Sequence, residues 1–283
     1  MSVIYGSLNV DEKYSSILEP NLYHDSVFAD GMTFTSKYED GPAGGIFVHK
    51  LATSAVAVGT PGRDFQDEAT ADTLIPIVLN NNFQKSKKIY GVQASAVALP
   101  LANEQLSIAT KEVSEGFTLG GLACLVQEGT PSANKATSLT KANIKNQVLA
   151  DRKQIRDAKG NADVLLMGTE AFALLLENFG SEFTPIANEY VNANGQIGKW
   201  LGFTVVECSA LSEATGDYYD YTGTKQTVTL GNSYIMYNHE ALSIVPNFDV
   251  ARIVDSELFN GSKAQVEMNV GYRVTSAPQV VVR

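Results

Sequence analysis

The sequence predicts an α+β fold, in which strand-rich stretches precede and follow a helical middle. Residues 36–98 contain β-branched and aromatic runs separated by glycine and proline, a pattern typical of strands and turns. Residues 101–178 carry apolar side chains at helical spacing around one short apolar run. The chain has 283 residues, of which 44% are hydrophobic, so it can bury the core of one large domain or two modest ones.

Residues 1–35 are predicted to form an extended arm with a short helical turn. Their apolar residues, among them Tyr5, Leu22 and Phe28, are scattered among polar ones and do not suggest a packed unit. An arm with this much apolar surface needs something to lie on, and a neighbouring subunit would provide it.

Residues 36–98 are predicted to form a long two-stranded projection with a glycine-rich tip. Residues 41–45 (Gly-Pro-Ala-Gly-Gly) signal a turn, and a strand follows at Ile46–Leu51. A polar loop is expected at residues 60–68. Two further strands are expected at residues 74–79 and 88–93.

Residues 101–128 are predicted to form one helix, because apolar side chains recur in it at near-helical spacing. Gly116, Gly120 and Gly121 lie in its second half, where each glycine costs up to ~1 kcal/mol relative to alanine. These glycines therefore indicate either a bend or a close approach of another segment.

The next part of the chain is predicted to be an α/β core followed by a second lobe of strands and loops from about Phe183. Capping residues and apolar stripes support the α/β core. Its expected elements are a helix over residues 141–159 between the N-cap Thr140 and Gly160, a buried strand over residues 163–167, and a helix from Thr169 to about Asn178.

Composition excludes some classes of function. The formal net charge is −10 and acidic residues outnumber basic ones, 31 to 21, so a dedicated nucleic-acid reader is not expected. No apolar run reaches the roughly 18–20 residues of a membrane span, and residues 1–6 lack the features of a secretory signal. Cys124 and Cys208 lie in apolar runs and are expected to be buried free thiols in a reducing compartment.

Catalytic motifs are sparse. There is no Gly-x-Ser-x-Gly elbow, and Gly198-Lys199 is followed by Trp200 and not by the Ser or Thr of a P-loop. The three histidines, His24, His49 and His239, lie in separate regions and form no His-x-x-x-His pair. A nucleophile–base pair of Cys208 and His239 is conceivable, although nothing local supports it.

Charged clusters leave alternatives open. Residues 217–221 (Asp-Tyr-Tyr-Asp-Tyr) form either a cation or sugar site or a solvent-facing loop. Asp67, Glu68 and Asp72 form either a metal site or a charged loop tip that pairs with a neighbouring subunit. The basic clusters at residues 85–88 and 152–156 face either DNA or solvent and intersubunit partners.

The order of these elements resembles the major capsid proteins of tailed bacteriophages, which have the Hong Kong 97 fold. Three motifs carry the resemblance: Gly198, Gly202, Phe203 and Val205 in a turn that leads into a strand, residues 163–168 in a strand that leads into a helix, and the closing residues 271–283. The resemblance implies five parts: an N-terminal arm (1–35), an extended β-hairpin loop (36–98), a long spine helix with the peripheral domain (99–182), an axial domain (183–250), and C-terminal strands that return to the peripheral domain (251–283).

The resemblance implies a shell-forming subunit that makes hexamers and pentamers, with no catalytic residue, cofactor or metal. Because the arm begins almost at Met1, without the built-in scaffolding segment of some members, a separate scaffolding protein is expected and removal of a prodomain is not. A portal, a possible decoration protein and packaged DNA, which the shell contacts without specific recognition, are further expected partners. The expected location is the virion capsid, with assembly in the host cytoplasm, and no membrane partner is expected.

Some members of the family crosslink neighbouring subunits through a lysine on the extended loop. No motif assigns that role to Lys50 here. The expected intersubunit contacts are Tyr5, Leu22 and Phe28 on the arm and Phe47, Arg63, Asp64 and Phe65 on the loop.

Two alternatives remain at this point. An encapsulin-like bacterial nanocompartment shell would share the fold, although the start of the chain does not resemble that of an encapsulin. A cysteine-dependent hydrolase that uses Cys208 is the other alternative, and the missing motifs argue against it.

Overall fold

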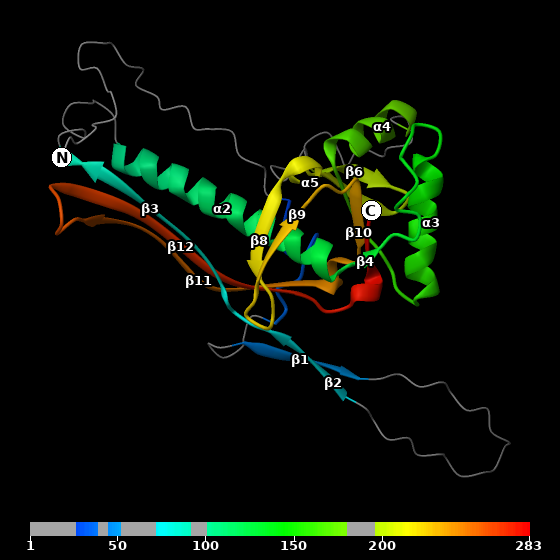
Figure 1. Cartoon of the computed structure of the whole chain (residues 1–283), viewed down its shortest axis with the longest axis horizontal. Coiled ribbons are helices and arrows are strands. Elements are labelled where there is room, and N and C mark those ends of the chain that lie inside the picture. Colours follow the sequence, from blue (N-terminus) through cyan, green and yellow to red (C-terminus); the bar gives the residue numbers. More distant parts are fainter. Residues whose placement is uncertain (1–26, 39–44, 52–71, 92–100, 180–195) are drawn as a thin grey trace, which may run out of the picture.

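Helix α2 (Leu101–Glu128) is the longest element, and it lies along a three-stranded antiparallel sheet (Figure 1). The computed structural model describes residues 27–38, 45–51, 72–91, 101–179 and 196–283. Within these ranges the helix has the bounds that the sequence predicts. No helix of the described part of the chain is long and apolar enough to cross a membrane.

The three-stranded sheet turns one face toward α2 (Figure 1). Val266 of the central strand packs with Ala109 and Val113 of the helix. The helix glycines mark a close approach and not a break, because a Cβ at Gly116 or Gly120 would lie 3.1 or 3.0 Å from the Phe83 ring. The strands, in sheet order, are β11 (Leu242–Asp255), β12 (Gly261–Val274) and β3 (Asn81–Tyr90).

A second sheet of six strands holds the rest of the core between two helical layers. Leu165 and Met167 pack with α3 and α4 on one face, while Val164 and Leu166 pack with the second half of α2 on the other. Burial on both faces explains why the strand over residues 164–167 is an uninterrupted apolar run. The helices are α3 (Ile144–Asp157) and α4 (Thr169–Phe179). The strands, in sheet order, are β4 (Thr130–Pro131), β13 (Val280–Val282), β10 (Tyr234–Tyr237), β5 (Val164–Met167), β7 (Phe203–Glu207) and β6 (Gln196–Trp200).

Two hairpins complete the described structure. One packs on α2, where a Cβ at Gly216 would lie 2.4 Å from the Leu119 carbonyl oxygen. The other is a two-stranded pair that extends away from both sheets (Figure 1). The remaining elements are β8 (Thr215–Tyr219), β9 (Lys225–Thr229), β1 (Ile46–Leu51), β2 (Asp72–Ile77), the short helix α5 (Ala210–Glu213) and 3-10 turns at His239–Ala241 and Ala277–Gln279.

Several local predictions need correction. Helix α3 begins at Ile144, because Asn143 accepts a hydrogen bond from the Thr140 N–H in a preceding turn and Thr140 is not the N-cap. The strand predicted at residues 88–93 is β3, which ends at Tyr90 and pairs with β12 instead of joining the projection. The glycine-rich run at residues 41–45 precedes β1, so it is not the tip between β1 and β2.

The expected border near Phe183 does not separate two sheets. Strand β5, which precedes it, pairs with β7 and β10, which follow it. Helices α3 and α4 cover this shared sheet, whereas α2 also runs along β12 and β3. The division of the chain into peripheral and axial domains therefore stays a prediction that strand order alone does not mark.

Candidate functional site

The β1–β2 projection exposes a strip of apolar side chains. Phe47 is 63% exposed and Leu74 is 51% exposed. Phe47 pairs with Pro76 and His49 pairs with Leu74, so these four side chains lie on one face. His49 Nδ1 lies 2.5 Å from Asp72 Oδ2 at the outer end of this face.

Such a projection needs a covering surface. An isolated two-stranded sheet is marginally stable in water, and a hydrophobic face on it adds an unfavourable contact with solvent. Within the described residues the face of Phe47 and Leu74 has no such cover. The projection is therefore the strongest candidate for a contact with another molecule.

The predicted contact residues differ in their exposure to solvent. Phe47 is exposed, as a contact residue must be. Phe28 is only 7% exposed, and its ring meets Phe34 and Phe117 edge to face. Gly121 of α2 leaves room for the Phe28 ring in the core of its own chain, so its burial gives no support to the predicted contact, which stays a prediction. The other predicted contacts, Tyr5, Leu22, Arg63, Asp64 and Phe65, lie outside the described residues.

Sequence reasoning missed Leu74, the second exposed apolar residue of the projection. Leu74 sits in a mostly apolar run that resembles a buried strand. The signal that could have revealed it is position: Leu74 and Ile77 lie three apart in a strand, so they point to opposite faces. Ile77 is fully buried at the base, which leaves Leu74 outward.

Cys208 and His239 do not form a nucleophile–base pair. The Cys208 N–H bonds to the Met167 carbonyl at one end of β5, and the His239 ring bonds to Asp163 just before the other end. Asp163 and Met167 lie four residue steps apart along extended chain, a distance of about 13 Å. Burial also raises the pKa of the Cys208 thiol to about 11, so the thiol is protonated at neutral pH.

Cys124 is likewise a buried free thiol, and burial raises its pKa well above the ordinary value. This confirms the prediction of two buried free thiols. Both side chains contribute to the core that joins α2 to the six-stranded sheet. Their position indicates a packing role.

The acidic candidates are occupied by protein partners. Asp217 pairs with Lys225, and Asp220 accepts hydrogen bonds from its own turn. The hydrogen bond from Lys225 lowers the pKa of Asp217. In the described ranges no three His, Cys, Asp or Glu side chains gather as a metal site would require. Asp67 and Glu68 lie outside these ranges.

The basic clusters are divided between faces. Lys85 and Lys87 point toward α2 and bind Glu112 at 3.1 and 2.6 Å. Lys88 lies on the opposite face of β3 because side chains alternate. Arg152 donates to the Leu201 carbonyl at 3.0 Å, so only part of each cluster remains for an external partner. Lys50 is exposed on β1, where it pairs with Thr73.

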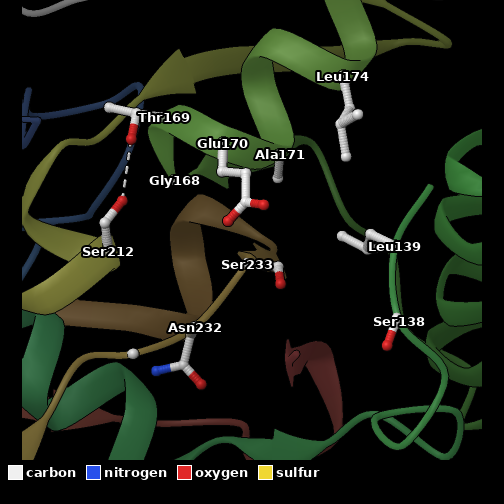
Figure 2. A pocket seen from close by; sticks show the side chains of 11 residues that line it. Ser138, Leu139, Gly168, Thr169, Glu170, Ala171, Leu174, Ser212, Asn232 and Ser233 are labelled. Carbon is white, nitrogen blue, oxygen red and sulfur yellow. Dashed lines mark hydrogen bonds between the residues drawn. The ribbon is translucent and has the colours of Figure 1, made fainter. Parts of the chain in front are cut away.

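An open pocket of about 490 Å³ lies where β5 leads into α4. Figure 2 shows Thr169 bonded to Ser212 across one side, with Glu170 projecting from the first turn of α4. The lining consists of hydroxyl, amide and apolar groups, with Glu170 as its carboxylate and neither histidine nor cysteine. This set lacks a nucleophile with an adjacent base.

Comparisons with known proteins identify the fold. No model of a known protein family matches the sequence, and no curated protein matches it significantly. A chain of Mycobacterium phage Che8 matches with a TM-score of 0.70 at 19% identity, over 96% of this chain and 95% of that one. A chain from the capsid of cyanophage P-SCSP1u matches with a TM-score of 0.71 at 13% identity, over 96% and 91%.

A third similar structure is the asymmetric unit of the mature capsid of bacteriophage PhiM1. It matches with a TM-score of 0.62 at 14% identity, over 100% of this chain and 95% of the other. At such identities the likeness establishes the fold. The predicted α+β fold of the tailed-phage capsid type, known as the Hong Kong 97 fold, is therefore confirmed.

Proposed function

We propose that this chain is the major capsid protein of a tailed phage, which assembles with its own copies into the shell around packaged double-stranded DNA. The observation that carries the proposal is the β1–β2 projection, whose exposed Phe47 and Leu74 need a cover, on a fold found in phage capsids. The role is structural and not catalytic. No observation favours the nanocompartment shell or the hydrolase.

In the proposed mechanism each projection lies across a neighbouring copy and buries its apolar face there. Hexamers and pentamers repeat this contact, so a modest free energy per contact is multiplied over a closed shell. The arm (1–35) adds a second contact. Since Val27 and Phe28 are packed in the core of their own chain, an arm that reaches a neighbour does so with residues before Val27.

The proposal carries further expectations about partners. A separate scaffolding protein, a portal and a decoration protein are expected to join copies of this chain in the virion capsid, which assembles in the host cytoplasm. Packaged DNA is contacted by proximity and not by sequence readout. The net charge of −10 supports the absence of a dedicated phosphate-binding face.

Expression of the chain, alone and with a candidate scaffolding protein, tests the proposal. Sedimentation velocity and negative-stain microscopy should reveal closed shells, tubes or capsomer rings in at least one of the two conditions. A chain that stays monomeric in both conditions, at concentrations well above those of a phage-infected cell, would refute it.

A further inference from the structure

The β1–β2 projection joins the body through a short connection. Strand β2 ends at Ile77 and β3 begins at Asn81, so only three residues separate the projection from the three-stranded sheet. Ile77 is fully buried, and a Cβ at Gly271 would lie 2.9 Å from the Val78 carbonyl oxygen. This apolar anchor fixes the position of the connection.

A second, polar anchor lies at the same place. Asn81 is only 2% exposed; its Oδ1 accepts from the Tyr219 N–H at 2.7 Å, and its Nδ2 donates to the Tyr219 carbonyl at 3.1 Å. The Asn81 side-chain amide thus forms two hydrogen bonds with the Tyr219 backbone, as the backbone of a neighbouring strand would. Asn80 Nδ2 donates to the adjoining Asp220 carbonyl at 2.7 Å.

The segment that these two asparagines hold is itself ordered. Tyr219 ends β8, and Asp220 begins the turn to β9, which extends toward the start of β3 (Figure 1). Asp220 Oδ1 accepts from the N–H groups of Thr222 and Thr224, and Oδ2 accepts from Gln226. A turn closed by its own side chain gives the asparagines a fixed partner.

The turn is also tied to the body on its other side. The Arg273 guanidinium of β12 stacks over the Tyr221 ring, with 4.1 Å between the Arg273 Cζ atom and the ring centroid. Arg273 in turn donates to Glu128 Oε1 at 2.6 Å, and Glu128 Oε2 accepts from the Val274 N–H. A continuous set of contacts therefore runs from the end of α2 through β12 and the β8–β9 turn to the base of the projection.

We propose that Asn80 and Asn81 act as a clamp that fixes the direction in which the β1–β2 projection leaves the body. The clamp is a positioning device within one chain. Each of its hydrogen bonds makes a modest net contribution, so the clamp orders the connection and can still open. Its consequence for assembly rests on the proposed function: a projection with a fixed direction meets its neighbour at one angle, which sets one curvature of the shell.

Pulsed electron paramagnetic resonance on the unassembled chain tests the clamp. Spin labels attached through Lys50→Cys on β1 and Lys153→Cys on α3, both exposed positions, report the distance between projection and body. The expected result is one narrow distance distribution in the parent chain and a broadened one in Asn80→Ala and Asn81→Ala. Asn82→Ala is the matched control, because Asn82 is exposed and bonds to Glu267 within the sheet.

Hydrogen exchange adds a local measurement that does not depend on the labels. Loss of its bond to Asn81 should raise the exchange rate of the Tyr219 amide about fivefold, the factor that corresponds to the typical net contribution of one hydrogen bond. Asn80→Ala keeps the test decisive if the buried Asn81→Ala variant does not fold. Parent-like distance distributions and exchange rates in both variants would overturn the proposal.

Particle images separate the clamp from the proposed function. Assembled Asn80→Ala should give shells of mixed diameter or tubes, whereas Asn82→Ala should give the parent shell. If the parent chain never assembles but the Asn80→Ala variant shows the broadened distance distribution, the capsid proposal is refuted and the clamp is supported. Shells that form normally from a variant with unchanged distances would overturn the clamp alone.

Discussion

Replacing Phe47 with serine removes the most exposed aromatic ring of the β1–β2 projection. A phenylalanine presents roughly 200 Å², and 63% of Phe47 is exposed, which leaves on the order of 130 Å² for a neighbour to bury. At ~25 cal/mol per Å² this burial contributes about 3 kcal/mol, and ordering of side chains reduces the net value to about 2 kcal/mol. If each subunit covers one neighbour, the critical concentration for assembly should rise about 30-fold.

The assay is the concentration of free subunit that coexists with shells, measured by sedimentation over a dilution series. Leu176→Ser is the matched control, because Leu176 is 42% exposed on α4, away from the projection. Both variants should unfold within about 0.5 kcal/mol of the parent, since both sites are exposed. A critical concentration that does not change for Phe47→Ser would refute the reasoning that the projection is a contact surface.

Three further predictions concern the core. Phe28→Ala should lower the free energy of unfolding by about 3–5 kcal/mol because the ring fills the space beside Gly121; a loss below about 1 kcal/mol in guanidinium unfolding would contradict its placement in the core. Burial raises the pKa of Glu128 from its ordinary value near 4.5, so the folded state holds this proton more tightly than the unfolded chain. The free energy of unfolding of the parent, measured relative to that of Glu128→Gln, should therefore fall as pH rises above 4.5. If the free energies of unfolding of the two proteins change with pH in the same way, this prediction is wrong. Cys124 and Cys208 should resist alkylation at pH 8 until the chain unfolds, as mass spectrometry can show; rapid labelling of the folded chain would mean that the thiols are accessible.

Much of the fold could be predicted from local patterns. Helix α2 follows the predicted bounds because its apolar spacing is continuous and its glycines are accommodated by aromatic rings from other segments. Strands β1 and β5 are also predicted, since a short apolar run between turn signals defines each of them. These features depend on residues close together in the sequence.

The sequence predicts the structure poorly where residues far apart in the chain determine strand pairing or burial. Strand β3 has a partner about 180 residues further along the chain, so no local pattern distinguishes it from a strand of the projection. The burial of Phe28 depends on a glycine 93 positions away. Asn80 and Asn81 resemble ordinary turn residues, and only their bonds to the β8–β9 hairpin give them a positioning role.

The most direct test of the central claim is a three-dimensional reconstruction of the assembled chain by electron cryomicroscopy. The account predicts a closed shell of five- and six-membered rings, in which the face of Phe47 and Leu74 lies against a neighbouring copy. Assemblies in which this face remains in solvent, or a chain that forms no ordered assembly with or without a scaffolding protein, would contradict the claim.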